Sequence, residues 1–119
     1  TFGRMLYKAK EAIEAFEKEE NATIELIDLQ SLAPLDLETL YQSIEKTGRL
    51  VIVEESCLTG GVGSEISAKI MEHCFYDLDA PIIRVAGKDM PIPFSPYLED
   101  QVLPIVSDIK NSIVKCLQK

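Results

Sequence analysis

The chain has 119 residues, of which 46% are hydrophobic and 27% charged, a composition typical of one globular domain. Its formal net charge of -8 disfavours nucleic acid and anionic membrane surfaces as partners, because both attract clustered Lys and Arg. The same charge would attract a basic protein. No apolar run approaches the ~20 residues of a membrane helix, and the sequence shows no signal-peptide pattern. We therefore expect residues 1–119 to form a single domain.

The first predicted helix has apolar residues at helical spacing from Met5 to Phe16 and ends near Glu20-Asn21. The next segment, Thr23–Leu29, is rich in apolar and β-branched residues, which predicts a strand. The first residues, Thr1–Arg4, lack Met and have the pattern of the tail of a strand. We therefore expect the sheet's first strand to be truncated and part of the protein to lie upstream.

A second helix is predicted between Asp36, a residue type that caps helix starts, and Gly48, which suits the left-handed position after a helix end. The central strand Leu50–Val53 follows as four consecutive apolar residues, a pattern typical of a strand covered on both faces. A glycine turn then opens a third helix, expected from Val62 to Tyr76.

A third strand is predicted over Ile82–Ala86, and three prolines then hold an extended loop through Pro96. A short helical turn is expected over Leu98–Asp100. Pro104 is predicted at the first position of the last helix, where its missing N–H costs nothing. Strands that alternate with helices imply a mainly parallel sheet between two helical layers, a three-layer α/β/α sandwich.

The glycine turn Gly60–Ser64 is a candidate anion site, because a helix amino terminus presents free N–H groups and partial positive charge. However, Glu54 and Glu55 lie just upstream, and neither a Walker lysine nor a GxGxxG pattern is present. A tight turn with close packing is the favoured reason for these glycines. Neighbouring strand residues face opposite ways, so we interpret Glu54 and Glu55 as ion-pair or interface residues rather than an acid/base pair.

Two further residues, His73 and Cys57, are candidate catalytic groups. His73, the only histidine, has no serine or carboxylate at a telling offset, so a structural role is favoured. Cys57 lies beyond the central strand without an activating cation nearby, which argues against a nucleophile. The three cysteines, Cys57, Cys74 and Cys116, form no CxxC pair, which indicates a reducing compartment rather than a disulfide or zinc framework. We predict no catalytic, cofactor-binding or metal-binding residue in this chain.

The loop from Lys88 to Tyr97 carries more apolar side chains than a small domain readily buries, and it is either packed over its own sheet or a partner surface. From the residues alone, two function classes remain open. One is an assembly or docking domain of a larger enzyme. The alternative is a small nucleotide- or flavin-binding α/β module that uses the Gly60–Ser64 turn.

Four segments in order resemble one family. Ile27–Asp36 (IDLQSLAPLD) and Lys46–Glu55 (KTGRLVIVEE) resemble segments of thiamine-diphosphate enzymes with a transketolase C-terminal domain. Gly61–Ile66 (GVGSEI) and Ala80–Phe94 (APIIRVAGKDMPIPF) are similar to the beta subunits of 2-oxoacid dehydrogenases. The departures are Phe94, where the family commonly has tyrosine, and the loop at Cys57-Leu58. Residues 1–119 are thus expected to be a transketolase C-terminal-like domain.

The resemblance implies a parent enzyme that decarboxylates a 2-oxoacid, with pyruvate favoured, and transfers the acetyl group to lipoamide. Its thiamine diphosphate and magnesium would be bound outside this segment. The implied partners are the dehydrogenase's alpha subunit, a second beta subunit and the basic peripheral-subunit-binding domain of the acetyltransferase. The implied compartment is the bacterial cytoplasm, or the mitochondrial matrix or plastid in a eukaryote. The candidate docking residues are acidic: Asp77, Asp79, Glu99 and Asp100.

Overall fold

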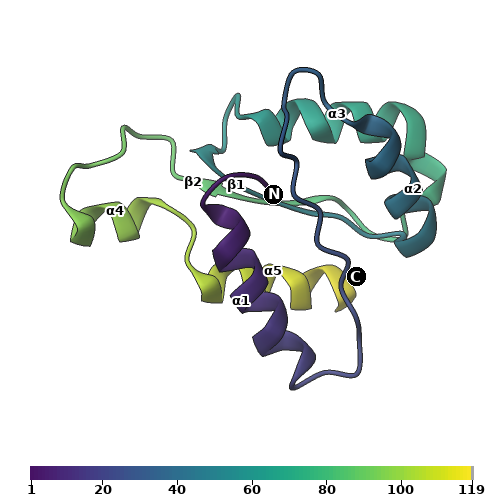
Figure 1. The fold of residues 1–119 in the computed structure, drawn as a ribbon, viewed down its shortest axis with the longest axis horizontal. Coiled ribbons are helices and arrows are strands. Elements are labelled where there is room, and N and C mark those ends of the chain that lie inside the picture. The colour runs from purple at the N-terminus through teal and green to yellow at the C-terminus, as the bar shows by residue number, and fades with distance from the viewer. Residues whose placement is uncertain (119) are drawn as a thin grey trace.

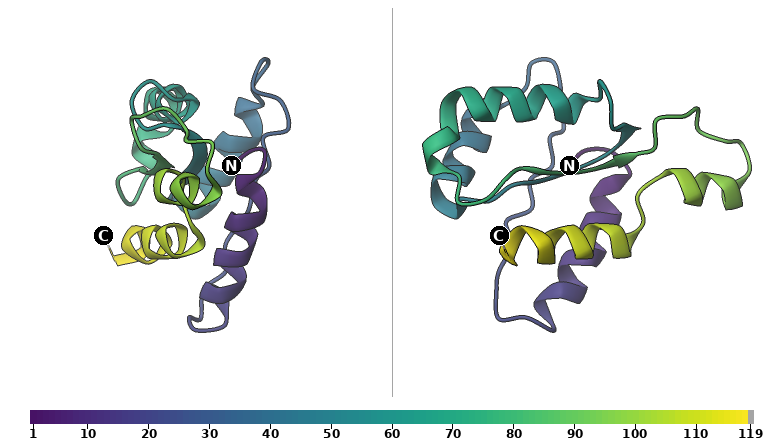
Figure 2. Two further views of the ribbon diagram at one scale, coloured as in Figure 1. Left: turned by 90° about the vertical axis from the view of Figure 1, so that its left-hand side faces the viewer. Right: turned by 180° about the vertical axis from the view of Figure 1, so that it is seen from behind.

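A two-stranded parallel sheet forms the centre of the molecule in the computed structural model, which describes residues 1–118 (Figure 1). Strand β1 (Val51–Cys57) pairs with β2 (Ile83–Gly87), with Val51 opposite Ile83 and Val53 opposite Val85. Helices α1 (Met5–Glu17) and α5 (Val106–Gln118) cover one face, and α2 (Leu37–Thr47) and α3 (Val62–Cys74) cover the other (Figures 1 and 2). The predicted three-layer α/β/α architecture with a parallel sheet is confirmed.

Two apolar cores, one on each side of the sheet, follow from the alternation of side chains along a strand. Val53 faces one way and packs with Met5, Phe16 and Ile109 from α1 and α5. Its neighbour Ile52 faces the other way, into the cluster of α2 and α3. The central strand is therefore apolar on both faces, as its unbroken run of apolar residues predicts.

Local capping fixes several helix boundaries. Asp36 accepts a hydrogen bond from the Thr39 N–H at 3.1 Å, and Gly48 ends α2 at φ 66°, both as predicted. The last helix starts later than expected. The carboxylate of Asp108 accepts the Ile105 N–H at 3.1 Å, so α5 begins at Val106 and Pro104 lies buried just ahead of it.

The predicted strand over Thr23–Leu29 is wrong. The segment crosses the molecule without helical coils (Figure 1), but it is not part of the sheet. Its backbone has no strand beside it to complete a ladder: the Leu29 N–H donates to the Thr1 carbonyl at 2.9 Å, and a cavity separates the rest of the segment from β1. Its composition suits a strand, but a strand also needs a partner.

Residues 88–102, called the arm from here on, leave the carboxyl end of β2 and return to it. The arm carries α4 (Pro96–Val102), longer than the predicted turn at Leu98–Asp100, and extends to one side of the body (Figures 1 and 2). Its two ends meet where the Lys88 N–H donates to the Val102 carbonyl at 3.0 Å. No helix among residues 1–118 is both long and apolar enough to cross a membrane.

Candidate functional site

Glu54 lies in the middle of β1 and is completely buried. Its two carboxylate oxygens accept the Gly63 N–H at 3.1 and 3.0 Å, and Oε1 also accepts Arg84 Nη2 at 3.1 Å. Ser56 donates its hydroxyl to Oε2. Burying a charged carboxylate costs free energy. Here the charge of Arg84, the hydrogen bonds and the positive end of the α3 dipole offset that cost.

The glycines of the turn allow the chain to approach this carboxylate. A Cβ on Gly63 would lie 2.3 Å from Glu54 Oε1, and one on Gly61 would lie 2.5 Å from the Cys57 carbonyl oxygen. The predicted reason, a tight turn with close packing, is confirmed. Because Glu54 occupies the amino terminus of α3 with a negative charge, the turn does not fit the phosphates of a nucleotide, a flavin or a diphosphate cofactor.

Arg84, the second residue of β2, completes this cluster, and the sequence reasoning missed it. Its Nη2 also donates to the Leu58 carbonyl at 2.6 Å, which ties the loop after β1 to β2. Its Nε is buried without a hydrogen-bond partner among the described residues. The available signal was an arginine within an otherwise apolar strand, a position that requires a charged partner.

Glu55 faces the opposite side of β1, as the alternation predicted. Arg4 Nε contacts its carboxylate at 2.8 Å, while Arg4 Nη2 contacts Glu99 of α4 at 2.7 Å. The hydrogen bond to Glu99, followed by the charge of Glu55, raises the pKa of Arg4. These pairs are solvent-exposed and contribute little stability, but they join the start of α1 to both the sheet and the arm. The predicted ion-pair role of both glutamates is confirmed.

The arm exposes large apolar side chains, so it is not simply packed over its own sheet. Phe94 is fully exposed and Tyr97 is 76% exposed. The other exposed apolar residues of the arm are Met90, Ile92 and Leu98. The arm's base is held by Asp89, whose carboxylate accepts the Thr59 N–H at 2.8 Å and the Thr59 hydroxyl at 2.6 Å. The Thr59 hydroxyl, then its N–H, lowers the pKa of Asp89. The arm therefore presents a conformationally fixed apolar surface to solvent.

The structure divides the four candidate docking residues into two pairs. Asp77 and Asp79 are exposed at the amino ends of the strands, where the Asp79 N–H donates to the Gly48 carbonyl at 2.7 Å. Glu99 and Asp100 lie on α4, beyond the carboxyl ends. Glu99 is half-buried and paired with Arg4, which leaves Asp100 as the exposed member of that pair. The four residues therefore do not form one acidic patch, and their role stays a prediction.

The remaining candidates have local contacts. His73 stacks on Tyr41 with ring centroids 4.8 Å apart, and its Nδ1 lies 3.2 Å from the Lys69 carbonyl oxygen. Cys57 is exposed, whereas Cys74 and Cys116 are buried, and all three are free thiols. Burial raises the pKa of both buried thiols. Among residues 1–118, no group of three or more His, Cys, Asp or Glu side chains is placed to hold a metal ion.

Comparison with protein families gives a match over almost the whole chain. The family described as "Transketolase, C-terminal domain" matches residues 1–109. The pyruvate dehydrogenase E1 component subunit beta of Rhizobium meliloti is 41% identical over 109 residues, which is 92% of this chain and 23% of that protein. The mitochondrial counterpart from Dictyostelium discoideum is 40% identical over 118 residues, which is 99% of this chain and 33% of that protein.

Two further proteins are similar to this chain. The 2-oxoisovalerate dehydrogenase subunit beta of Pseudomonas aeruginosa is 48% identical over 93 residues, covering 78% of this chain and 25% of that protein. A solved structure titled "Split gene transketolase, inactive beta4 tetramer" superposes with a TM-score of 0.81 and 29% identity, covering 98% of this chain and 36% of that one. The chain thus spans at most about a third of the length of these curated relatives.

Proposed function

Because this chain belongs to the transketolase C-terminal domain family, we propose that it is the association domain of the beta subunit of a thiamine-diphosphate-dependent 2-oxoacid dehydrogenase. The names of its relatives, which are pyruvate and 2-oxoisovalerate dehydrogenase beta subunits, support this class. Within the class we propose pyruvate dehydrogenase, whose parent reaction decarboxylates pyruvate and transfers the acetyl group to lipoamide. In support, the two pyruvate dehydrogenase matches above cover more of this chain than the 2-oxoisovalerate match does.

The observation that carries the proposal is the arm. Its apolar side chains are exposed, yet its base is held by the Asp89–Thr59 and Arg4–Glu99 contacts. A conformationally fixed surface loses little conformational entropy on binding. Aromatic side chains such as Phe94 and Tyr97 are enriched in typical interfaces. The proposed occupants are the alpha subunit or a second beta subunit of the same enzyme.

The cofactors of the parent enzyme, thiamine diphosphate and magnesium, are proposed to be bound outside this domain. The amino terminus of α3, where a diphosphate would be expected in an α/β fold, holds the Glu54 carboxylate instead. The domain is proposed to extend over residues 1–119 and to act in the bacterial cytoplasm, or in the mitochondrial matrix or plastid. A relative from a bacterium supports the bacterial setting, and a relative named as mitochondrial supports the mitochondrial one.

The test of subunit association changes one aromatic side chain of the arm in the full-length beta subunit. Phe94→Ala is expected to weaken assembly with the alpha subunit, or of beta with beta, by at least about tenfold in dissociation constant. Tyr76→Ala is the matched control, because Tyr76 is 96% exposed but lies outside the arm. Analytical ultracentrifugation measures both. Equal assembly of Phe94→Ala, Tyr76→Ala and the unchanged protein would contradict the role of the arm.

Docking of the acetyltransferase is tested separately with its basic peripheral-subunit-binding domain. Because the acidic candidates form two pairs, the double variant Asp77→Lys/Asp79→Lys is compared with Asp100→Lys. Glu99 is left unchanged because it pairs with Arg4. Charge reversal at the true surface should slow association and reduce its salt dependence. Glu11→Lys/Glu14→Lys on exposed α1 positions is the charge-matched control. If all variants bind like the unchanged protein at low and high salt, the acidic docking residues are wrong.

A further inference from the structure

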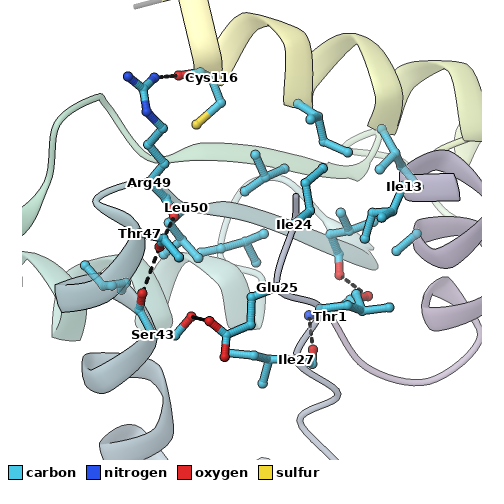
Figure 3. Close-up of a pocket in the computed structure, with 18 of the residues that line it drawn as sticks. Thr1, Ile13, Ile24, Glu25, Ile27, Ser43, Thr47, Arg49, Leu50 and Cys116 are labelled. Atoms are coloured by element: carbon cyan, nitrogen blue, oxygen red, sulfur yellow. Dashed lines mark hydrogen bonds between the residues drawn. The ribbon is translucent and has the colours of Figure 1, made fainter. Parts of the chain in front are cut away.

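The two edges of the central sheet have different surroundings. The edge of β1 faces an apolar cavity of about 210 Å³ (Figure 3). Thr1, at the end of the strand expected upstream, lies in the wall of this cavity and donates its hydroxyl to the Val53 carbonyl at 2.8 Å. The edge of β2 has no strand beside it among residues 1–118, and a groove lies along its outer side.

The hydrogen bonds of β2 show which of its backbone groups face outward. The Ile83 N–H donates to the Leu50 carbonyl at 3.1 Å, so residue 83 bonds on the β1 side. Because successive backbone groups of a strand alternate in direction, the N–H and carbonyl groups of Arg84 and Ala86 point away from β1. Among residues 1–118 no hydrogen bond joins these groups to another segment. The outer edge of β2 therefore has backbone donors and acceptors without protein partners.

The base of the arm bounds this unpaired edge at one end. The Lys88 N–H continues the same two-residue spacing and donates on the outer side, to the Val102 carbonyl at 3.0 Å. The pairing stops there, because the Lys88 carbonyl accepts the Met90 N–H at 2.7 Å, within the arm. Pro81, which has no N–H, precedes β2 at the other end. The unpaired stretch therefore lies between Pro81 and Lys88.

A groove of about 550 Å³ follows residues 84–88 along this edge. It is lined on one side by the Arg84 side chain, which lies beside Gly63 at the start of α3, and on the other by Asp108 of α5. Because α3 and α5 cover opposite faces of the sheet (Figures 1 and 2), a groove that reaches both sides passes across the edge between them. Residues 100–105 form its far wall. The backbone of β2 is therefore accessible along the groove.

The groove carries an excess of negative charge. Three exposed carboxylates line it, those of Asp89, Asp100 and Asp108. Two cations line it as well, but the charge of Arg84 is paired within the buried cluster described above, which leaves Lys88 against the three carboxylates. The net charge of -8 on the whole chain has the same sign. A positively charged segment is therefore attracted to this edge.

We propose that the outer edge of β2 binds an extended, basic segment of another protein, which adds to the sheet as its next strand. The backbone of the segment bonds to Arg84 and Ala86, and its basic side chains meet Asp100 and Asp108 on the groove walls. Strand addition draws its affinity from main-chain bonds, so extended conformation and positive charge specify the partner rather than one particular sequence. Because the attraction is between exposed charges, binding weakens as salt increases.

Charge favours this partner over a second copy of the chain. A second copy would bring the same carboxylates to the groove and has a net charge of -8, so like charges would oppose the pairing. The site is also distinct from the exposed apolar surface of the arm, because it offers backbone groups and carboxylates instead of aromatic side chains. The proposal therefore goes beyond subunit association through Phe94 and Tyr97, and substitutions in the arm separate the two.

Binding of a synthetic peptide to the full-length beta subunit tests the proposal. The probe is a short, fluorescently labelled peptide of alternating lysine and valine, and anisotropy measures its dissociation constant. The same peptide with its interior backbone nitrogens methylated keeps the charge but lacks N–H donors, so it should bind at least about tenfold more weakly. Phe94→Ala should leave binding of the probe unchanged. Equal binding of the two peptides would mean attraction by charge alone and would overturn the proposal, as would no binding of the unmethylated one.

Hydrogen exchange locates the bound peptide. At saturating peptide the Arg84 and Ala86 amides should exchange at least about tenfold more slowly. The Val85 amide, which bonds to β1, is the internal reference. Unchanged exchange at both outward amides would show that the peptide binds elsewhere. Slow exchange of these amides without peptide, increasing with protein concentration, would assign the edge to a second copy and overturn the proposal.

Two kinds of substitution change the site itself. Ala86→Pro removes one outward N–H, and an edge strand tolerates proline there because the bonds to the neighbouring strand remain. This variant should bind the peptide at least about tenfold more weakly. Asp100→Lys tests the charge without altering the strand, and it should weaken binding more than Glu11→Lys, an exposed α1 position with the same change in net charge. Equal effects of the two charge reversals, or full binding by Ala86→Pro, would overturn the proposal.

Discussion

Glu54 places both of its carboxylate oxygens on the backbone N–H of Gly63, at 3.1 and 3.0 Å, nine residues further along the chain. This contact joins the middle of the central strand to the start of α3 and leaves no room for a side chain at position 63. The contact explains why this glycine-rich turn, at a place where α/β proteins often bind ligands, instead allows close packing. It also predicts how substitutions of Gly63 and Glu54 change stability.

Gly63→Ala is expected to destabilise the protein by about 2 kcal/mol, because the new Cβ would lie 2.3 Å from a buried oxygen that cannot move freely. Urea unfolding measures the change, and Ser64→Ala, in the same turn, is the control. In the double variant Gly63→Ala/Glu54→Ala the clash disappears, so the combined loss should be smaller than the sum of the single losses. Strictly additive losses would contradict the contact.

Glu54→Gln keeps the size of the side chain but removes its charge opposite Arg84. We expect a loss of about 3 kcal/mol, because the guanidinium, only 20% exposed, loses its charged partner. Glu55→Gln is the matched control on the same strand: its partner Arg4 is 53% exposed, so a loss below about 1 kcal/mol is expected. Equal losses for the two variants would show that burial does not distinguish these ion pairs.

Gly48→Ala tests the left-handed end of α2. Gly48 has φ 66°, and an added Cβ would meet Asp79 Oδ2 at 2.5 Å, whereas Gly60 has φ 72° with no atom within 4 Å. Gly60→Ala should therefore cost about 1 kcal/mol from backbone strain alone, and Gly48→Ala should cost more. The difference should vanish when both are measured in an Asp79→Ala background. A larger cost for Gly60→Ala would contradict this reasoning.

The arm should loosen in acid. Hydrogen bonds from Thr59 lower the pKa of Asp89 below its ordinary value of 3.8, so the folded state binds that proton less readily than the unfolded state. The stability from this contact is present above about pH 4 and is lost as the pH falls through the lowered pKa. Asp89→Asn should therefore flatten the acid side of a plot of unfolding midpoint against pH, while Asp100→Asn, on the same arm, is the control. An unchanged acid side would contradict the Asp89–Thr59 contact.

The three thiols should differ in their rates of reaction with a thiol reagent. Cys57 is exposed, whereas burial raises the pKa of Cys74 and Cys116 and keeps them protonated. An aromatic disulfide reagent is expected to modify one thiol per chain rapidly in the native protein and all three after unfolding. Cys57→Ser should abolish the rapid phase. Rapid modification of two or three thiols in the native protein would show that the buried sites open readily.

The sequence by itself determined the features that depend on neighbours along the chain. Asp36 and Gly48 bound α2 because a cap and a left-handed residue act within one turn of helix. The unbroken apolar run in β1 gave the two-sided core, and the alternation of Glu54 and Glu55 gave their opposite directions. The family motifs identified the domain type, and the match over residues 1–109 agrees with them.

Only the tertiary structure decided which distant groups meet. The local sequence does not predict that Arg84 pairs with Glu54 or that Arg4 pairs with Glu99. It also does not predict that Asp77 and Asp79 lie far from Asp100. These relations depend on how the helices and strands pack. The wrong strand prediction at Thr23–Leu29 has the same cause. The residue types of this segment favour an extended chain, but a strand is completed by hydrogen bonds to a neighbouring strand. In the structure a cavity, not a strand, lies between this segment and β1.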